Sequence, residues 1–199
     1  MPKAGISING VRNTTISGGA FSDNVTDLYL GIRGTGANVI VEGVECNGAS
    51  RAGIWLQGSA ANVGGATITG ARVNAGETAR ALYSPNDEIH YVNEVRISDC
   101  DFATRYLTAV EVSASPTPAA NWSFSNVTCT ARGTPFQAYQ FGGQMTIKGM
   151  RLVLSDGGTE GYSAFRCYGA GAMIVDGLMI AGQTVGTTLD TRRFVGSLV

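Results

Sequence analysis

Residues 65–73 of this 199-residue chain read GATITGARV, and this nonapeptide decides the fold. Apolar side chains stand at its second and fourth positions and again at its seventh and ninth. Each pair alternates with outward residues in the period-2 manner of a half-buried β-strand. The two pairs are out of phase by one residue, and Gly70 stands between them. Because glycine, asparagine and aspartate tolerate the left-handed backbone of a sharp bend, the pattern predicts a strand, a corner and a second strand.

The same nine-residue frame recurs six more times. The copies are NTTISGGAF (13–21), NVIVEGVEC (38–46), EVRISDCDF (94–102), NWSFSNVTC (121–129), QMTIKGMRL (144–152) and AMIVDGLMI (172–180). Their fourth positions lie 23 to 29 residues apart, and the sixth position is always Gly, Asn or Asp. A repeat of this length indicates a solenoid, and it is too short for the blades of a β-propeller.

A second alternating run follows each of the first six frames. These runs are DLYLG (27–31), GIWLQG (53–58), RALYS (80–84), AVEVS (109–113), AYQFG (138–142) and AFRCYG (164–169). We therefore predict an all-β fold, a parallel β-helix of about seven coils with three strands per coil. The coils should occupy residues 1–180. The tail, 181–199, should cap the last coil or contact another subunit, since the ends of a solenoid expose unpaired strand edges.

Composition narrows the possible partners. The net charge is −1 and only 15% of residues are charged, so no footprint for nucleic acid or for an anionic membrane is present. We find no signal-peptide pattern and no apolar run long enough to cross a membrane. The four cysteines are Cys46, Cys100, Cys129 and Cys167, and three of them occupy inward frame positions. We expect buried, reduced thiols, and we expect no metal and no cofactor.

The outward side chains of the second runs should stack into rows on one face. The predicted middle row is Tyr29, Trp55, Leu82, Glu111, Gln140 and Arg166. The row on one side is Asp27, Gly53, Arg80, Ala109, Ala138 and Ala164, and the row on the other side is Gly31, Gln57, Ser84, Ser113, Gly142 and Tyr168. Sugars bind to aromatic platforms flanked by charged and amide groups. We predict a glycan groove formed by Tyr29, Trp55, Arg80, Glu111 and Arg166; the alternative is an ordinary solvated strand face.

Catalytic candidates are few. The loop 84–93 carries Asp87, Glu88 and the only histidine, His90. Glu111, Asp87 and His90 are the candidates for acid–base chemistry, and a surface role is the alternative for each. Glycoside hydrolysis would need a second carboxylate about 5 to 10 Å from Glu111. Glu77, Asp101 and Asp87 are the candidates for that partner.

The repeated frame resembles the pectate-lyase-like superfamily of right-handed parallel β-helices, over about residues 5–180. The superfamily includes pectate lyases, polygalacturonases, alginate epimerases and bacteriophage tailspikes. The Asn-Thr-Asp, Asp-Asp and Gly-His-Gly motifs of polygalacturonases are absent, as are the aspartate cluster and basic motif of pectate lyases, so no catalytic residue carries over.

Short coils and the missing secretion signal make the chain most similar to tailspikes and tail fibres. This resemblance implies a virion appendage outside the cell that is structural or binds a receptor. Its ligand would be a cell-surface glycan. It also implies a homotrimer or a larger virion assembly. The alternatives are a polysaccharide lyase or glycoside hydrolase with its carboxylates near Glu111, and a passive structural subunit of a larger assembly.

Overall fold

The computed structural model describes residues 4–9, 13–32, 38–58, 64–84, 92–113, 121–139, 143–155, 162–169, 171–182, 189–194 and 197–198. Every regular element in these ranges is a β-strand. No helix that is long and apolar enough to cross a membrane occurs in them.

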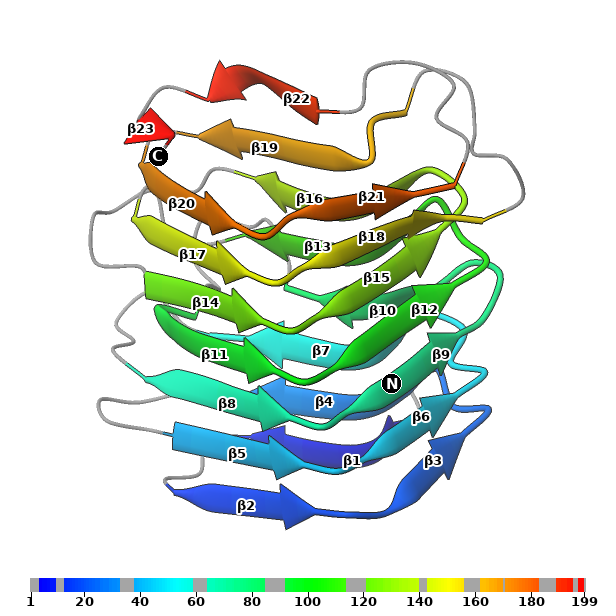
Figure 1. Ribbon diagram of the computed structural model, residues 1–199. Helices are drawn as coiled ribbons and strands as arrows, with labels where there is room; N and C mark the ends of the chain where they lie inside the picture. Colours follow the sequence, from blue (N-terminus) through cyan, green and yellow to red (C-terminus); the bar gives the residue numbers. More distant parts are fainter. Residues whose placement is uncertain are drawn as a thin grey trace.

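The strands form three parallel sheets (Figure 1). Sheet A contains β1 (Ala4–Asn9), β4 (Thr26–Gly31), β7 (Ala52–Gln57), β10 (Arg80–Tyr83), β13 (Thr108–Ser113), β16 (Thr134–Tyr139), β19 (Phe165–Gly169) and β22 (Leu189–Phe194). Sheet B contains β2 (Thr14–Ser17), β5 (Asn38–Glu42), β8 (Gly65–Thr69), β11 (Glu94–Ser98), β14 (Asn121–Ser125), β17 (Gln144–Lys148), β20 (Ala172–Asp176) and β23 (Ser197–Leu198). Sheet C contains β3 (Ala20–Ser22), β6 (Glu45–Asn47), β9 (Arg72–Ala75), β12 (Asp101–Thr104), β15 (Thr128–Ala131), β18 (Arg151–Leu154) and β21 (Met179–Ala181).

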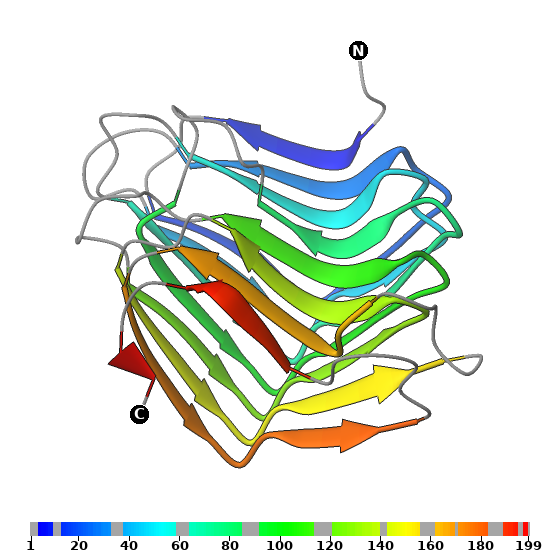
Figure 2. The ribbon, with the colours of Figure 1, turned by 90° about the horizontal axis from the view of Figure 1, so that it is seen from above.

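The chain visits sheets A, B and C in turn and rises by one strand in each sheet per coil. In Figure 1 it runs rightward along the front and leftward along the back while it climbs, which is a right-handed path. The predicted parallel β-helix with three strands per coil is therefore confirmed. Figure 2 shows sheets B and C meeting at a corner, with sheet A across from them.

The corner between sheets B and C lies where the frame places it. The seven corner residues all have positive φ: Gly18 (67°), Gly43 (59°), Gly70 (63°), Asp99 (55°), Asn126 (53°), Gly149 (61°) and Gly177 (70°). The two non-glycine corners are adjacent, and Asn126 Nδ2 donates a hydrogen bond of 3.1 Å to Asp99 Oδ1. The predicted strand–corner–strand frame is thus confirmed in every copy.

The core fills with the inward frame positions. At the fourth position Val41, Ile68, Ile97, Phe124 and Ile147 are at most 1% exposed. Aromatic rings continue this core toward sheet A, where Phe136 and Phe165 stack at 5.1 Å. Trp122 lies fully inside, and its indole N–H donates to the carbonyl of Val92 at 2.9 Å.

The four cysteines are free and buried, as predicted. Burial raises the pKa of the Cys46 thiol to about 12 and that of Cys100 to about 11. Neutral thiols of this kind behave as small apolar side chains.

Part of the predicted tail continues the solenoid. β22 pairs with β19 and β23 pairs with β20, so residues after 181 extend sheets A and B, while sheet C ends at β21. A contact between this end and another subunit stays a prediction.

Sheet A departs from the predicted alternation. In β4, β7, β10, β13 and β16 two or more consecutive residues are buried, such as Asp27 with Leu28 and Ala81 with Leu82, all 0% exposed. Position 53 belongs to the same set, because a Cβ on Gly53 would overlap Cγ1 of Val73 in the interior. In β10 this moves the outward position from Leu82 to Tyr83, which stands in register with Trp55.

Candidate functional site

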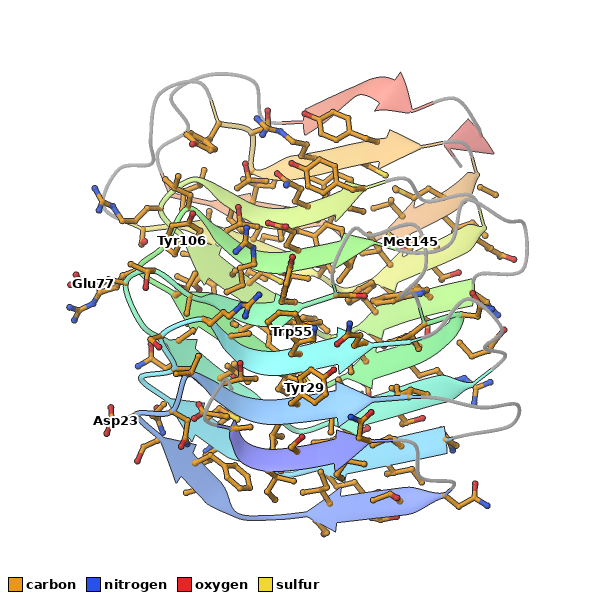
Figure 3. All side chains as sticks on the ribbon, turned by 180° about the vertical axis from the view of Figure 1, so that it is seen from behind. Asp23, Tyr29, Trp55, Glu77, Tyr106 and Met145 are labelled. Atoms are coloured by element: carbon orange, nitrogen blue, oxygen red, sulfur yellow. The ribbon has the colours of Figure 1, made fainter. Side chains whose placement is uncertain are left out.

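The outer face of sheet A carries the predicted row with two corrections (Figure 3). The register aligns Tyr29, Trp55, Tyr83, Glu111, Gln137 and Arg166. Leu82 was placed in this row wrongly: it is fully buried, and Tyr83 takes its position. The predicted Gln140 lies outside the described residues, and Gln137 aligns with Glu111 instead.

The flanking rows also change. Asp27, Gly53, Ala109, Ala138 and Ala164 are buried rather than outward, and so is Ser84. Arg80 does lie on the outer face, in register with Ala52. Tyr139 joins Tyr168 in the row on the other side. The alternation of apolar and polar residues does not decide between Leu82 and Tyr83 as the outward residue. The signal that could have identified Tyr83 is its aromatic ring, which continues the series of Tyr29 and Trp55.

Three aromatic rings form the lower half of this face. The ring centroids of Tyr29 and Trp55 are 6.0 Å apart, and those of Trp55 and Tyr83 are 5.0 Å apart in an edge-to-face arrangement. The guanidinium carbon of Arg51 lies 4.2 Å from the Trp55 ring centroid. Packed in this way, Trp55 is only 8% exposed. The Tyr29 hydroxyl donates a hydrogen bond to Gln57 Oε1.

An ion pair occupies the middle of the face. Nε of Arg80 lies 2.6 Å from Oε2 of Glu111, and both side chains are largely buried. The same guanidinium lies 4.8 Å from the ring centroid of Tyr83 and 5.6 Å from that of Tyr106. Arg80 and Glu111, two of the predicted groove residues, therefore contact each other, and their charges neutralise each other.

A second aromatic cluster lies at the upper end of the face. Tyr139 and Tyr168 have ring centroids 5.3 Å apart, and the Arg166 guanidinium lies 6.0 Å from the Tyr168 ring. Burial raises the pKa of Tyr139, and the nearby Glu111 carboxylate adds to the shift.

A groove crosses β1, β4 and β7 beside the lower aromatics. It encloses about 370 Å³ and is lined by Ala4, Ser7, Asn9, Thr26, Tyr29, Trp55 and Gln57. This volume is within the range of small-molecule sites, roughly 300–1,000 Å³. The Trp55 indole N–H and the Thr26 hydroxyl are buried and have no hydrogen-bond partner within the described part of the chain. Thr26 precedes the predicted run, and no pattern in the sequence marked it.

The catalytic candidates are not assembled into a site among the described residues. Asp87 and His90 lie outside those residues. Asp101 faces outward from sheet C, in register with Arg72, and so lies on a different face from Glu111. Glu77 lies at the edge of the molecule in Figure 3, with its carboxylate 3.7 Å from Arg105. Glu111 is paired with a cation rather than with a second acid.

A metal site is not evident in the described ranges either, since they hold no group of three or more His, Cys, Asp or Glu side chains suited to an ion. A scan against protein-family models finds no match for this chain, and searches of curated proteins and of solved structures find none.

Proposed function

We propose that this chain is a tailspike- or tail-fibre-like β-helix of a virion appendage that binds a surface polysaccharide along the outer face of sheet A. The observation that carries the binding proposal is the row Tyr29–Trp55–Tyr83 beside a groove of about 370 Å³. Aromatic rings cover the apolar faces of sugars, and buried polar groups beside them fix orientation. The appendage role rests on the resemblance of the repeated frame to tailspike β-helices.

A binding role is favoured over hydrolysis by the partner of Glu111. A glycosidase needs two carboxylates about 5 to 10 Å apart. The Glu111 carboxylate instead accepts a charged hydrogen bond from Arg80 Nε at 2.6 Å, so a cation already occupies it. The second candidate is a lyase or hydrolase in which Glu111 works with an acid outside the described ranges, such as Asp87.

A homotrimer would bury the exposed apolar side chains near the upper end. Ile174 in sheet B is 37% exposed and Met179 in sheet C is 60% exposed. Light scattering on the purified chain measures the assembly directly. A trimer supports the appendage proposal, and a monomer counts against it.

Binding is tested on a panel of bacterial surface polysaccharides. We expect saturable affinity for at least one of them and no product. Trp55→Ala should raise Kd by about 30-fold, the loss typical of a central aromatic anchor. The matched control is Thr67→Ala, an outward residue of sheet B in register with Ile40 and Arg96. Because Trp55 is mostly buried, thermal unfolding of each variant must show that the fold persists.

An activity assay on the same panel separates the two candidates. New reducing ends or unsaturated sugar products, lost in Glu111→Gln while affinity is kept, would favour the enzyme. Neither binding nor product would leave the passive structural subunit as the better account.

A further inference from the structure

The turns that join sheet C to sheet A surround a hollow that the proposed function does not use. It encloses about 510 Å³ and is lined by Glu77, Thr78, Arg105 and Arg132. These residues come from three successive turns, which follow β9, β12 and β15. The label of Glu77 marks this edge of the molecule in Figure 3. Three neighbouring coils therefore build the hollow together.

Hydrogen bonds hold these turns against one another. The hydroxyl of Thr104, which is 4% exposed, lies 3.0 Å from the carbonyl oxygen of Gly76 and 2.6 Å from that of Ala79. The same hydroxyl accepts from the N–H of Tyr106 at 2.9 Å. One coil higher, the N–H of Arg132 donates to the carbonyl of Tyr106 at 3.2 Å. The backbone beneath the lining side chains is thus ordered in advance, which lowers the cost of binding a ligand.

The hollow carries more positive than negative charge. Nη1 of Arg105 lies 3.7 Å from Oε1 of Glu77, which is an ion pair longer than a hydrogen bond. No carboxylate lies within ion-pair distance of Arg132 in the part of the chain that the structure describes. Two guanidinium groups and one carboxylate leave a net charge of +1 at the hollow. This balance favours an anion.

The two guanidinium groups are the donors that a ligand would meet. Thr78 does not offer its proton, because its hydroxyl donates to the carbonyl of Ser50 at 3.0 Å. Arg105 and Arg132 stand on adjacent coils, and neighbouring strands of a parallel sheet are about 4.8 Å apart. Their planar forks suit the oxygens of a phosphate or a carboxylate.

We propose that this hollow binds a phosphate group, with Arg105 and Arg132 both donating to its oxygens. A phosphate monoester carries a charge of about −1.5 to −2 and three acceptor oxygens, so two forks bind it at once. A carboxylate has two oxygens, which a single fork satisfies. The ligand is a free phosphate ion or the phosphate ester of a larger molecule, since both present the same terminal group. The site lies apart from the outer face of sheet A and does not depend on glycan binding.

The experiment follows the arginine Nε–Hε signals of the full chain by NMR. Inorganic phosphate, glycerol phosphate and acetate are each titrated against chloride at neutral pH and constant ionic strength. We expect both phosphate-bearing probes to shift the signals of Arg105 and Arg132. The Kd should be millimolar, because both guanidinium groups are exposed and screened by solvent. Acetate should bind about fivefold more weakly or worse, because it engages one fork only.

Three variants assign the roles. Arg132→Gln should raise the phosphate Kd by about tenfold, the loss expected for one hydrogen bond to a charged group. Glu77→Gln removes the competing carboxylate and should lower the Kd by about threefold. Arg151→Gln is the matched control, because it makes the same charge change on the outer side of sheet C, in register with Thr128 and Met179. It should leave the Kd unchanged.

Three results would overturn the inference. Arg105 and Arg132 signals that do not respond to either phosphate probe reject the site. A Kd that rises as much in Arg151→Gln as in Arg132→Gln reduces the effect to net charge. Acetate binding as tight as phosphate binding rejects the preference for phosphate.

The two phosphate probes identify the source of the ligand. Binding of both supports an ester on a larger molecule, whereas binding of inorganic phosphate alone supports the free ion. Because none of these variants alters the outer face of sheet A, failure here leaves the glycan-binding proposal standing.

Discussion

Sheets B and C and sheet A are built from the same repeat but obey different local rules. In sheets B and C, each strand alternates strictly, and one left-handed residue at the corner absorbs the phase change, as at Gly70 with φ of 63°. In sheet A the phase change lies inside the strand, where Ala81 and Leu82 both face the core. In the sequence, Gly, Asn or Asp marks each corner, whereas no residue type marks the doubled inward position of sheet A.

The inward residues of sheets B and C and the outward residues of sheet A also differ in how much they vary between coils. The inward residues of sheets B and C are apolar from coil to coil and supply most of the core. The outer face of sheet A changes from coil to coil, from the rings of Tyr29, Trp55 and Tyr83 to the charges of Glu111 and Arg166. The repeated core therefore does not restrict which residue types stand on the outer face of sheet A.

The largest expected effect comes from a charged side chain on the inward face of sheet B. Ile97→Asp would bury an unpaired carboxylate at a position that is 1% exposed, so the chain should fail to fold. Far-ultraviolet circular dichroism and size-exclusion chromatography measure this loss. Arg96→Asp, on the outward side of the same strand, is the control and should fold normally. A folded Ile97→Asp chain would contradict the inward assignment.

Next in size is an added methyl group at the doubled inward position of sheet A. Gly53→Ala should destabilise the fold by about 3 kcal/mol, because its Cβ would overlap Val73 Cγ1. Urea denaturation measures the change. In a Val73→Ala background the same substitution should cost much less, which is the coupling expected of two residues in contact. A neutral Gly53→Ala would mean that position 53 faces outward after all.

A smaller cost should follow from a β-branched residue at the corner. Gly70→Val should lose about 2 kcal/mol through backbone strain. Space is not the cause, since the nearest atom to an added Cβ is the nitrogen of Gly43 at 3.7 Å. Gly70→Asn is the control, and it should be almost neutral because Asn126 already has φ of 53° at the equivalent corner. Equal urea midpoints for the valine and asparagine variants would contradict the requirement for a residue that accepts positive φ at this corner, which is what distinguishes the corner from sheet A.

The smallest effect should come from the acid inside sheet A. Burial raises the pKa of Asp27 above 3.8, and the hydrogen bond from Asn24 offsets this only in part. At low pH the carboxyl is protonated in both states. As the pH rises above 3.8 the unfolded carboxyl ionises first, so the wild type loses stability. Asp27→Asn should therefore be more stable than the wild type at pH 7, with the difference vanishing near pH 3. The denaturation midpoints of Asp27→Asn and the wild type are measured across this pH range. A difference between them that stayed constant with pH would contradict the prediction.

The sequence by itself determined the β-helix, the corners and the inward residues of sheets B and C, including the buried Cys46, Cys100 and Cys129. These features follow from side-chain period and from residues that accept positive φ, both of which are local properties. It also placed Tyr29, Trp55, Glu111 and Arg166 in one row.

Only the tertiary structure decided the register of sheet A and the contacts across its face. Tyr83 replaced Leu82 in the row because packing against neighbouring coils, and not the alternation of one run, chose which residues point inward. Likewise, Arg80 meets Glu111 across 31 residues of sequence, and Arg51 covers Trp55 from the turn before β7. Such contacts depend on how stacked coils align, which no single stretch of sequence encodes.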